Sequence, residues 1–354
     1  MRGHNVEIRV YDDEMNFQGI IENQRSLLWN RQYNETGSFE LHAPVTDYTI
    51  RLLQMGNLVW KRGAVDAGII ESRHIEEDAD TREIVASGRF LTAYMDRRLV
   101  RPLFNFSGKA EVAMRTILSN AVAIPNVQFG TLQGFTETIE FQATYKKLLS
   151  IEQKIAKQCQ LGFRFRPDFT AKTITFEVYK GLDRSMAQSD RARVIFSEDF
   201  RNLNRAIFEE NDQVYSNVCY VGGKGEGSER VFVTVGDTTS TGLERREVFV
   251  NGSDISDENL TTAQYQEALR QRGREKLAEM AYYQSVECEA IPYGNFEYLV
   301  DYDLGDIVTI KKESWGVGEN LRLFGVTEVY ENGTSTIQPI FGNPVPETAN
   351  WEDD

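Results

Sequence analysis

The sequence has 354 residues, of which 54 are acidic and 39 are basic, so its formal net charge is −15 at pH 7. Hydrophobic residues make up 41% and charged residues 26%, a composition typical of folded, soluble proteins. The negative charge disfavours a free-standing nucleic-acid binder, which needs a basic surface, and also a binder of anionic membranes. Because single cores stop growing near about 250–300 residues, we expect two or three domains.

No segment has the apolar core of a secretory signal, and none reaches the roughly 18 apolar residues of a membrane span. We therefore expect synthesis in a reducing cytoplasm and no membrane binding by the chain itself. The three cysteines, Cys159, Cys219 and Cys288, are odd in number and far apart. This spacing disfavours disulfides and Cys-x-x-Cys metal sites, and it predicts buried free thiols.

Short strands are expected over the first hundred residues. Residues 6–11 alternate between apolar and polar side chains, and the turn-forming cluster Asn34–Ser38 precedes a second strand-like run, Phe39–Pro44. Further apolar runs follow at regular spacing. Many short strands of this kind favour a small barrel or sandwich, and we assign residues 1–104 to a first β-barrel domain.

Helical spacing appears in the second hundred residues. Ser107 is a suitable N-cap for a first helix, and a second helix is expected to end just before Gly162, a residue type that favours the C-terminal cap. A strand hairpin is expected over residues 163–179. We assign residues 105–205 to a small α+β domain.

Strands return in residues 206–343 and are interrupted by one long helix. Thr261 and Gln264 form a capping-box pattern at its start, which predicts a helix over about 261–283. We assign residues 206–343 to a second β-barrel domain that contains this helix. Residues 344–354 are acidic and interrupted by proline, which predicts an extended tail.

Two segments of the chain resemble each other, since each has a turn, an apolar strand and then a Gly-x-x-Glu strand. The residues that define the two turns are Gly56, Asn57, Gly305 and Asp306. The second strands begin at Gly68 and Gly325. The match arises either from turn chemistry that β-rich chains reuse or from two related barrel domains on either side of the α+β domain. The residues alone leave both explanations open.

The usual catalytic patterns are absent from the sequence. His4, His42 and His74 have no companions at the spacing of a metal site or a catalytic triad, and no nucleophile elbow occurs. The glycine-rich run Gly222–Gly227 lacks the spacing of a phosphate-binding loop, and it predicts a mobile hairpin loop instead. The sequence therefore predicts no metal, no cofactor and no enzymatic site.

Several segments, in their order and spacing, resemble the tail hub proteins of siphophages and related prophages. The segments that carry the resemblance are Val10–Asp12, Leu28–Trp29, Gly37–Leu41, Tyr215–Gly227, Leu243–Val250 and Asp301–Val308. The resemblance covers about residues 6–343. It implies a homotrimer at the tip of a phage tail or tail-like injection device, with two tube-type antiparallel β-barrel domains in each subunit. Three subunits would then form a pseudo-hexameric ring that matches the six-fold tail tube.

This resemblance implies a structural function and no enzymatic one. A hub links the tail tube to spike, fibre or hydrolase components, so the expected partners are tail-tube and distal tail proteins, a tape measure protein and a spike or hydrolase subunit. The expected location is the tail tip of the virion, after assembly in the bacterial cytoplasm. If acidic side chains line the lumen, DNA is expected to pass through it without specific binding.

The glycine-rich loop is the candidate for contacts with a ring neighbour or a central spike. Its residues are Gly222, Gly223, Lys224, Gly225, Glu226, Gly227, Ser228 and Glu229. The glycines would permit the loop to rearrange during assembly.

Two alternatives to a hub differ in class. A tail-associated cell-wall or polysaccharide hydrolase would need convergent carboxylates in a cleft, and none stand out. A carbohydrate-binding module would need exposed aromatic side chains among Trp29, Trp60, Trp315 and Trp351. Trp29 and Trp60 lie in strand-like apolar runs, so we expect both of them to pack in the core.

Overall fold

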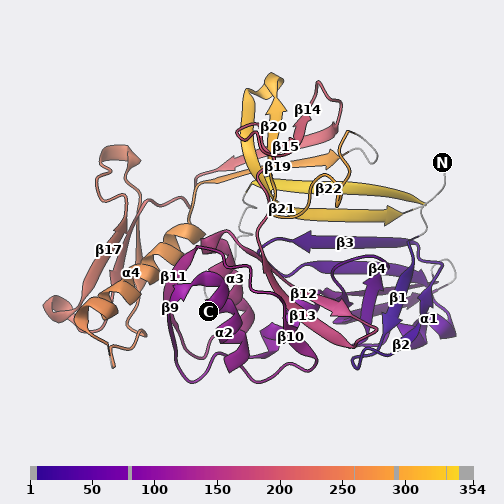
Figure 1. Ribbon diagram of the computed structural model, residues 1–354, viewed down its shortest axis with the longest axis horizontal. Coiled ribbons are helices and arrows are strands. Elements are labelled where there is room, and N and C mark those ends of the chain that lie inside the picture. Colours follow the sequence, from indigo (N-terminus) through magenta and orange to yellow (C-terminus); the bar gives the residue numbers. More distant parts are fainter. Residues whose placement is uncertain (1–5, 79–81, 259, 291–294, 332, 343–354) are drawn as a thin grey trace.

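The computed structural model describes residues 6–78, 82–258, 260–290, 295–331 and 333–342. Strands dominate this part of the chain; α2, α3 and α4 lie in the lower left half of Figure 1, and α1 lies at its right edge. The predicted class, mainly β with an α+β part, is confirmed. The chain has four parts, which we call the first β unit, the α+β unit, the insert and the second β unit. Closure of either β unit into a barrel stays a prediction.

The first β unit lies at the right of Figure 1. Its elements are β1 (Ile8–Tyr11), β2 (Phe17–Ile21), β3 (Ser26–Gln32), β4 (Ser38–Pro44), α1 (Asp47–Leu52), β5 (Leu58–Lys61), β6 (Gly68–Ile69), β7 (Ser72–Glu77), β8 (Arg82–Arg89) and the 3-10 helix η1 (Leu91–Arg97). Strands β2, β1, β5 and β6 form one sheet, and β3, β4, β8 and β7 belong to a longer one. Alternation in β3 and β4 directs Leu27, Trp29 and Leu41 into the core between these sheets.

The α+β unit packs two helices against short strands. Its elements are β9 (Phe104–Lys109), α2 (Ala110–Asn120), β10 (Val127–Phe129), β11 (Thr138–Ala143), α3 (Leu148–Cys159), β12 (Gly162–Asp168) and β13 (Thr173–Tyr179). Strands β9 and β11 form a two-stranded antiparallel sheet, and β10, β13 and β12 form a separate sheet. Its core continues into the first β unit through Tyr11, Leu58 and Ile69.

The second β unit stands above the others in Figure 1. Its elements are β14 (Ile195–Ser197), β15 (Leu203–Asn211), β19 (Tyr283–Ala290), β20 (Ile307–Lys312), the 3-10 helix η4 (Glu313–Trp315), β21 (Val317–Glu331) and β22 (Thr334–Gly342). Phe196, Val308 and Phe341 are among the buried residues of its core.

The insert is a separate lobe that leaves and rejoins the second β unit between β15 and β19. Its elements are β16 (Val218–Gly222), η2 (Gly227–Glu229), β17 (Phe232–Gly236), η3 (Gly242–Glu244), β18 (Glu247–Asn251) and α4 (Thr262–Glu279). The three strands form a sheet whose buried face packs on α4 around Val221 and Leu269. Asn211 and Tyr283, the residues on either side of the insert, are paired in the β15–β19 ladder.

The predicted domain boundaries stay predictions, but strand pairing differs from them in two places. Strand β14, which falls within the predicted α+β domain, pairs with β20, and Val194 and Phe196 are buried in the core of the second β unit. Residues 216–282, which fall within the predicted second barrel, contribute a sheet and a core of their own. The predicted tail, residues 344–354, lies outside the described residues.

Two predicted helix ends are wrong, and one is confirmed. Ser107 lies in β9, opposite Glu140 of β11, and the helix begins at Ala110. Gly162 begins β12, and α3 ends at Cys159 with Gln160 as its C-cap, in a left-handed conformation with φ of 54°. The predicted capping box is present, since the Thr261 side chain accepts from the N–H of Gln264 and the Gln264 side chain accepts from the N–H of Thr261.

Candidate functional site: the continuous sheet and the junction of the β units

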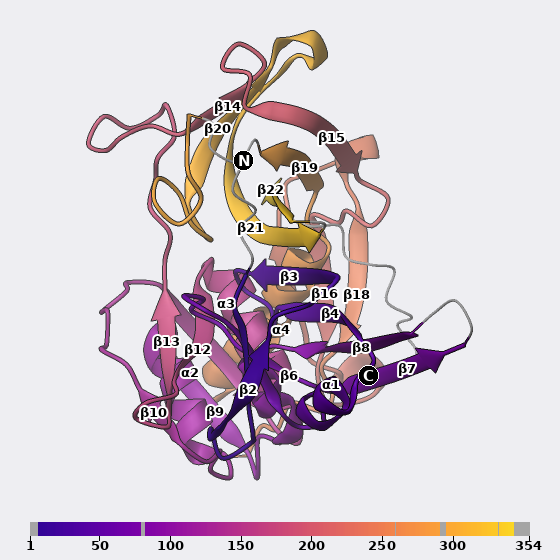
Figure 2. The same ribbon diagram turned by 90° about the vertical axis from the view of Figure 1, so that its right-hand side faces the viewer.

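Eight antiparallel strands run from one β unit into the other. Their order is β15-β19-β22-β21-β3-β4-β8-β7, with four strands from each unit and the junction between β21 and β3. Figure 2 shows this curved sheet from its side, with β15 at the top and β7 at the lower right. At the junction Thr327 pairs with Asn30, and Val329 pairs with Leu28. Two segments far apart in sequence therefore form one continuous surface.

The face of this sheet opposite the cores is mostly polar. Among the side chains that the structure describes, alternation places on it five glutamates, Glu40, Glu76, Glu83, Glu209 and Glu331, and the hydroxyl or amide side chains of Ser26, Asn30, Ser72, Ser87, Thr327, Thr334, Thr336 and Gln338. Its basic side chains are fewer: Arg89 is paired with Glu71, and Arg25 with Glu83. We call this surface the open face, and it is acidic on balance.

His42 and His74 both lie on the open face, on strands separated by β8. The His42 ring lies 2.9 Å from a Glu40 carboxylate oxygen and 3.2 Å from one of Glu83. Burial alone would lower the pKa of His42, but these two carboxylates raise it above its ordinary value. His42 is therefore part of an acidic polar cluster on the open face.

The two ends of the eight-stranded path are free edges in the described part of the chain. Strand β7 pairs only with β8 there, and β15 pairs only with β19. Because every step along the path is antiparallel, β7 and β15 run in opposite directions. Ile75 and Ile207 are both exposed on these edges. Unpaired edges of this kind can pair with strands of another chain.

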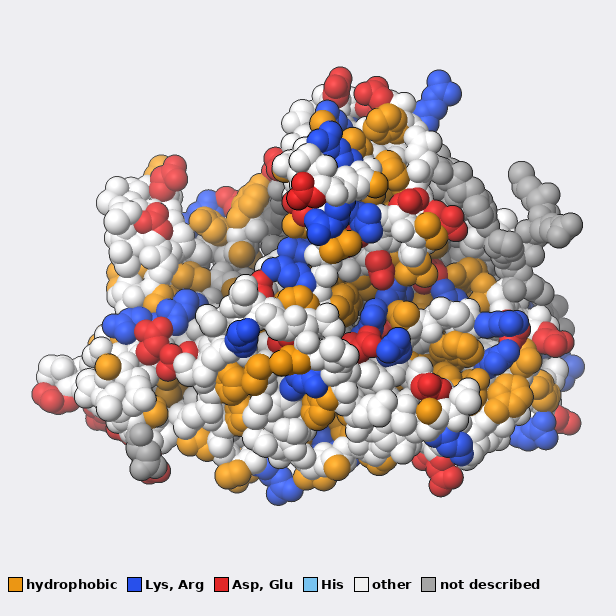
Figure 3. All heavy atoms as spheres, viewed as in Figure 1, with side chains coloured by type: hydrophobic (Ala, Val, Ile, Leu, Met, Phe, Trp, Pro, Cys, Tyr) orange, Lys and Arg blue, Asp and Glu red, His pale blue; other side chains and the backbone are white. Residues whose placement is uncertain are grey.

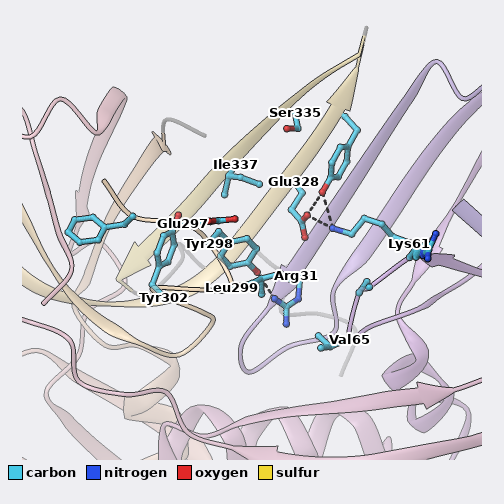
Figure 4. Close-up of a pocket in the computed structure, with 15 residues that line it drawn as sticks. Arg31, Lys61, Val65, Glu297, Tyr298, Leu299, Tyr302, Glu328, Ser335 and Ile337 are labelled. Atoms are coloured by element: carbon cyan, nitrogen blue, oxygen red, sulfur yellow. Dashed lines mark hydrogen bonds and ion pairs between the residues drawn. The ribbon is translucent and has the colours of Figure 1, made fainter. Parts of the chain in front are cut away.

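Buried charges join the two β units beneath the junction, as Figure 4 shows. Lys61 of β5 contacts Glu328 of β21, and its ammonium also donates to the Tyr330 hydroxyl at 3.0 Å. Arg31 of β3 donates to Asp66 at 2.8 Å and to Asp303 of the second β unit at 2.9 Å. Burial lowers the pKa of Lys61, and the charge of Glu328 opposes that shift.

A cavity of about 260 Å³ opens beside these charges. Its lining comes from both units and includes Arg31, Lys61, Tyr298, Leu299, Glu328 and Ile337. The buried cations in its wall already have carboxylate partners. These ion pairs therefore fit a role in holding the two units together better than a role in binding a charged substrate.

The two predicted repeat turns have the same geometry. Gly56 and Gly305 have φ of 87° and 88°, values that favour glycine. The N–H of Gly56 donates to Ile70, whose N–H donates back to Asn57, and Gly305, Leu323 and Asp306 repeat both bonds. These matching bonds support the explanation by two related domains.

The shared bonds also correct the register of the repeat. They make Ile70 equivalent to Leu323, so Gly68 corresponds to Leu321 and not to Gly325. The Gly-x-x-Glu part of the predicted repeat is therefore wrong. In the β20–β21 hairpin, Gly325 lies four residues beyond Leu321, the position equivalent to Gly68.

The glycine-rich loop is tied down at its beginning. The carbonyls of Gly222 and Gly223 accept from Arg230, and the N–H of Lys224 donates to the Tyr265 hydroxyl at 2.8 Å. A Cβ at Gly223 would lie 2.6 Å from that hydroxyl, so close packing on α4 explains this glycine. The remaining loop residues, Gly225 to Glu229, are exposed. A role for Gly222–Glu229 in assembly stays a prediction.

Residues outside these regions offer little catalytic chemistry. Among the described residues, no three His, Cys, Asp or Glu side chains gather as a metal site. In the same part of the chain, no helix is both long and apolar enough to cross a membrane. Cys159 and Cys219 are buried free thiols, as predicted.

The three tryptophans that the structure describes do not form an aromatic binding platform. Trp29 is buried in the first core, and Trp60 is partly buried, its indole N–H donating to Ala64 at 2.9 Å. Trp315 is exposed, with the Lys312 ammonium over its ring, and Trp351 lies outside the described residues.

Sequence reasoning missed Arg31, Lys61 and Glu328. A signal was available, since each is a charged residue at a core-facing position of an alternating strand. Such a charge in an apolar pattern indicates a buried partner. The identity of each partner depends on the junction, which joins residues almost 300 positions apart in sequence.

The chain matches one family model and shares its fold with solved tail proteins. The family model of Siphovirus ReqiPepy6 Gp37-like proteins matches residues 7–343. The fold is similar to that of the 43 kDa tail protein of prophage MuSo2 from Shewanella oneidensis, with 14% identity and a TM-score of 0.59 over 95% of this chain and 98% of that one. It is also similar to a tail protein from Neisseria meningitidis MC58, with 16% identity and a TM-score of 0.60 over 96% of this chain and 97% of that one.

A third similar structure is prophage tail protein gp18 from Listeria monocytogenes EGD-e, with 14% identity and a TM-score of 0.57 over 96% of this chain and 95% of that one. No curated protein matches the sequence. At these identities the solved structures establish a shared fold, whereas the family match spans nearly the whole sequence. The chain therefore belongs to the Siphovirus ReqiPepy6 Gp37-like family, a family of phage tail proteins.

Proposed function

We propose that this chain is the structural hub of a phage tail or tail-like particle, in which three copies form a pseudo-hexameric ring. The observation that carries the proposal is the eight-stranded antiparallel path with two free edges. Since β7 and β15 run in opposite directions, β7 of one copy can pair with β15 of the next and continue the antiparallel alternation. Three copies of an eight-stranded path would make a closed ring of 24 strands.

The repeat supports the number of copies. Each chain has two β units with the same turn bonds at Gly56 and Gly305, so three chains would place six similar units around one axis. Six units match a six-fold tail tube. The buried pairs Lys61–Glu328 and Arg31–Asp303 would keep the two units of one chain in a fixed relation.

The open face would line the central channel of this ring. Its glutamates outnumber its basic side chains, and like charge repels the phosphates of DNA. DNA or a tape measure protein could then pass without being held. The partners we propose are tail-tube and distal tail proteins at one end and a spike, fibre or hydrolase subunit at the other. The proposed location is the tail tip of the virion, after assembly in the bacterial cytoplasm.

Negative-stain electron microscopy of the purified chain tests the ring. We expect class averages with three-fold symmetry and a central hole, and sedimentation at the mass of three chains. One of the two variants His74→Pro and Ile75→Pro should reduce the chain to monomers. Adjacent residues of an edge strand direct their N–H groups to opposite sides, so only one of these two N–H groups points away from β8 towards a neighbouring copy. A well-folded wild-type chain that sediments only as a compact monomer would contradict the proposal.

A further inference from the structure

We propose that the insert is a hinged arm, which opens and closes against the α+β unit about its two-stranded stem. The inference concerns the described chain itself and does not depend on ring formation. Figures 1 and 3 show the insert as a lobe at the left, set apart from the second β unit by a notch. Within the chain it packs through α4 on β11 and α3 of the α+β unit.

The stem is narrow and ends where two strands are paired. Asn211 and Tyr283 are paired in the β15–β19 ladder. A short hairpin turn would therefore be enough to connect β15 to β19, and the insert takes the place of that turn. Above them, Ser216 donates its N–H to Met280 at 3.0 Å, and the Tyr215 and Tyr282 rings meet edge to face. Bending at both connections, residues 212–215 and 280–282, would move the whole insert without breaking the eight-stranded sheet.

The insert and the α+β unit do not share an apolar core. Val221, Leu269 and their neighbours form one buried cluster, and the α+β unit belongs to another. The insert is therefore stable through its own sheet and helix. An interface without a common core is the kind at which domains move relative to each other.

The contacts across the interface are polar and few. The Gln142 side chain donates to the Ser256 carbonyl at 3.4 Å and accepts from the Ser256 N–H at 2.8 Å. The Gln271 amide donates to Gln158 at 2.7 Å, and Lys154 lies 3.9 Å from Glu279. Each such bond contributes only a modest net free energy when it is exchanged for bonds to water, so a small number of them leaves the open form accessible and still sets its population.

The interface is also incompletely filled. A cavity of about 220 Å³ lies between the two parts. Its lining includes Phe141, Ile151 and Ile155 from the α+β unit and Val250, Arg272 and Glu275 from the insert. Apolar side chains that face a cavity lose the contacts that a packed interface supplies. Glu275, which is partly exposed, also lines this cavity, and burial raises the pKa of its carboxyl.

Single-molecule energy transfer on the full chain tests the hinge, with dyes attached through unnatural amino acids in place of Ser228 and Leu132, two exposed positions on the insert and the α+β unit. We expect two distances that interconvert. The double variant Gln142→Ala/Gln271→Ala should raise the ratio of open to closed molecules roughly ten-fold, because it removes the hydrogen bonds across the interface.

Gln128→Ala is the matched control, since Gln128 bonds Thr173 and Thr175 within the α+β unit. It should leave the distance distribution unchanged. A single narrow distance in both the wild-type chain and the double variant would overturn the proposal. So would hydrogen exchange showing that α4 and β16 lose protection together with the interface, because the insert would then unfold and not swing.

Discussion

At the residue scale, one position of the repeat has different roles in its two copies. The Asn57 side chain donates to Leu52 within its own turn at 2.8 Å. Its counterpart Asp306 is buried and accepts from the N–H of Leu182 at 2.7 Å and from the Arg184 guanidinium at 2.8 Å. Asp306 therefore binds the segment that leads into the second β unit. The turn shape that Asp306 shares with Asn57 does not by itself require these contacts.

Replacement of Asp306 by alanine should destabilise the second β unit by about 2–4 kcal/mol, because it removes a buried carboxylate that accepts from the Leu182 N–H and from the largely buried Arg184 guanidinium. Asp306→Asn, which keeps one acceptor oxygen, should cost less. Urea unfolding followed by circular dichroism measures both. The matched variant Asn57→Ala should cost about 1 kcal/mol. Equal losses at the two positions would contradict the role given to Asp306.

Glu152 of α3 is fully buried, and neither of its carboxyl oxygens has a hydrogen-bond partner among the described residues. Burial raises the pKa of Glu152 well above its ordinary value, so the folded chain keeps a proton that the unfolded chain loses above about pH 4.3. The folded state binds more protons there, and stability falls as the pH rises.

Glu152→Gln should therefore be more stable than the wild-type chain at pH 8, and the difference should shrink towards pH 4.5. Thermal unfolding midpoints across this range measure the effect. Glu111→Gln is an instructive control, because Glu111 is buried on α2 but accepts from the N–H groups of Gln133 and Gly134 at 2.7 and 2.8 Å. That variant should lose stability at pH 8. A pH-independent difference for Glu152→Gln would show that the carboxyl is not protonated.

At the element scale, α4 shows where helix propensity and packing disagree. Gly273 lies in the middle of the helix, where glycine costs about 1 kcal/mol relative to alanine. A Cβ there would lie 2.6 Å from a methyl of Val235 and 2.8 Å from one of Val221. The glycine therefore permits close contact between α4 and the sheet of the insert.

Gly273→Ala should destabilise the insert by about 1–3 kcal/mol, although helix propensity alone predicts stabilisation. Hydrogen exchange of the β16 and β17 amides measures the effect where it arises. Ala278→Gly, at an exposed position of the same helix, should cost about 1 kcal/mol through propensity alone. An increase in protection in Gly273→Ala would mean that the helix and the sheet can separate at no cost.

Local sequence signals predicted elements well where side chains interact only with their own turn. The capping box at Thr261 is such a case. The prediction that Ser107 caps a helix is wrong because the strand alternation of Phe104 and Phe106 continues through it. Its partner strand β11 lies about thirty residues further along the chain, so no local pattern reveals the pairing. Gly162 misled because its lack of a side chain serves a long-range contact, since a Cβ there would lie 2.5 Å from the Tyr33 ring.

At the scale of the whole molecule, the buried pair Lys61–Glu328 couples the two β units. Loss of one partner leaves the other charge buried without compensation, which typically costs about 3–5 kcal/mol, whereas removal of both partners is often close to neutral. The pair Lys61–Glu328 therefore adds little to the net free energy of unfolding, and its main effect is to hold the two units in a fixed orientation.

Lys61→Met should therefore destabilise the chain strongly, and Lys61→Met/Glu328→Leu should recover most of the loss. Urea unfolding with separate probes in the two units measures both stability and coupling. We expect Lys61→Met to separate the unfolding of the two units into two steps. Additive losses in the double variant would show that the two charges do not interact.

The sequence by itself determined the mainly β class, the capped helix near residue 261, the two glycine turns and, through segments spread over most of its length, the resemblance to tail hub proteins. These features depend on period, turn chemistry and composition, which neighbouring residues carry together. Only the tertiary structure decided that β21 pairs with β3, that Lys61 contacts Glu328 and that residues 216–282 form a lobe of their own. Those features depend on contacts between residues far apart in the chain, whose partners no local pattern identifies.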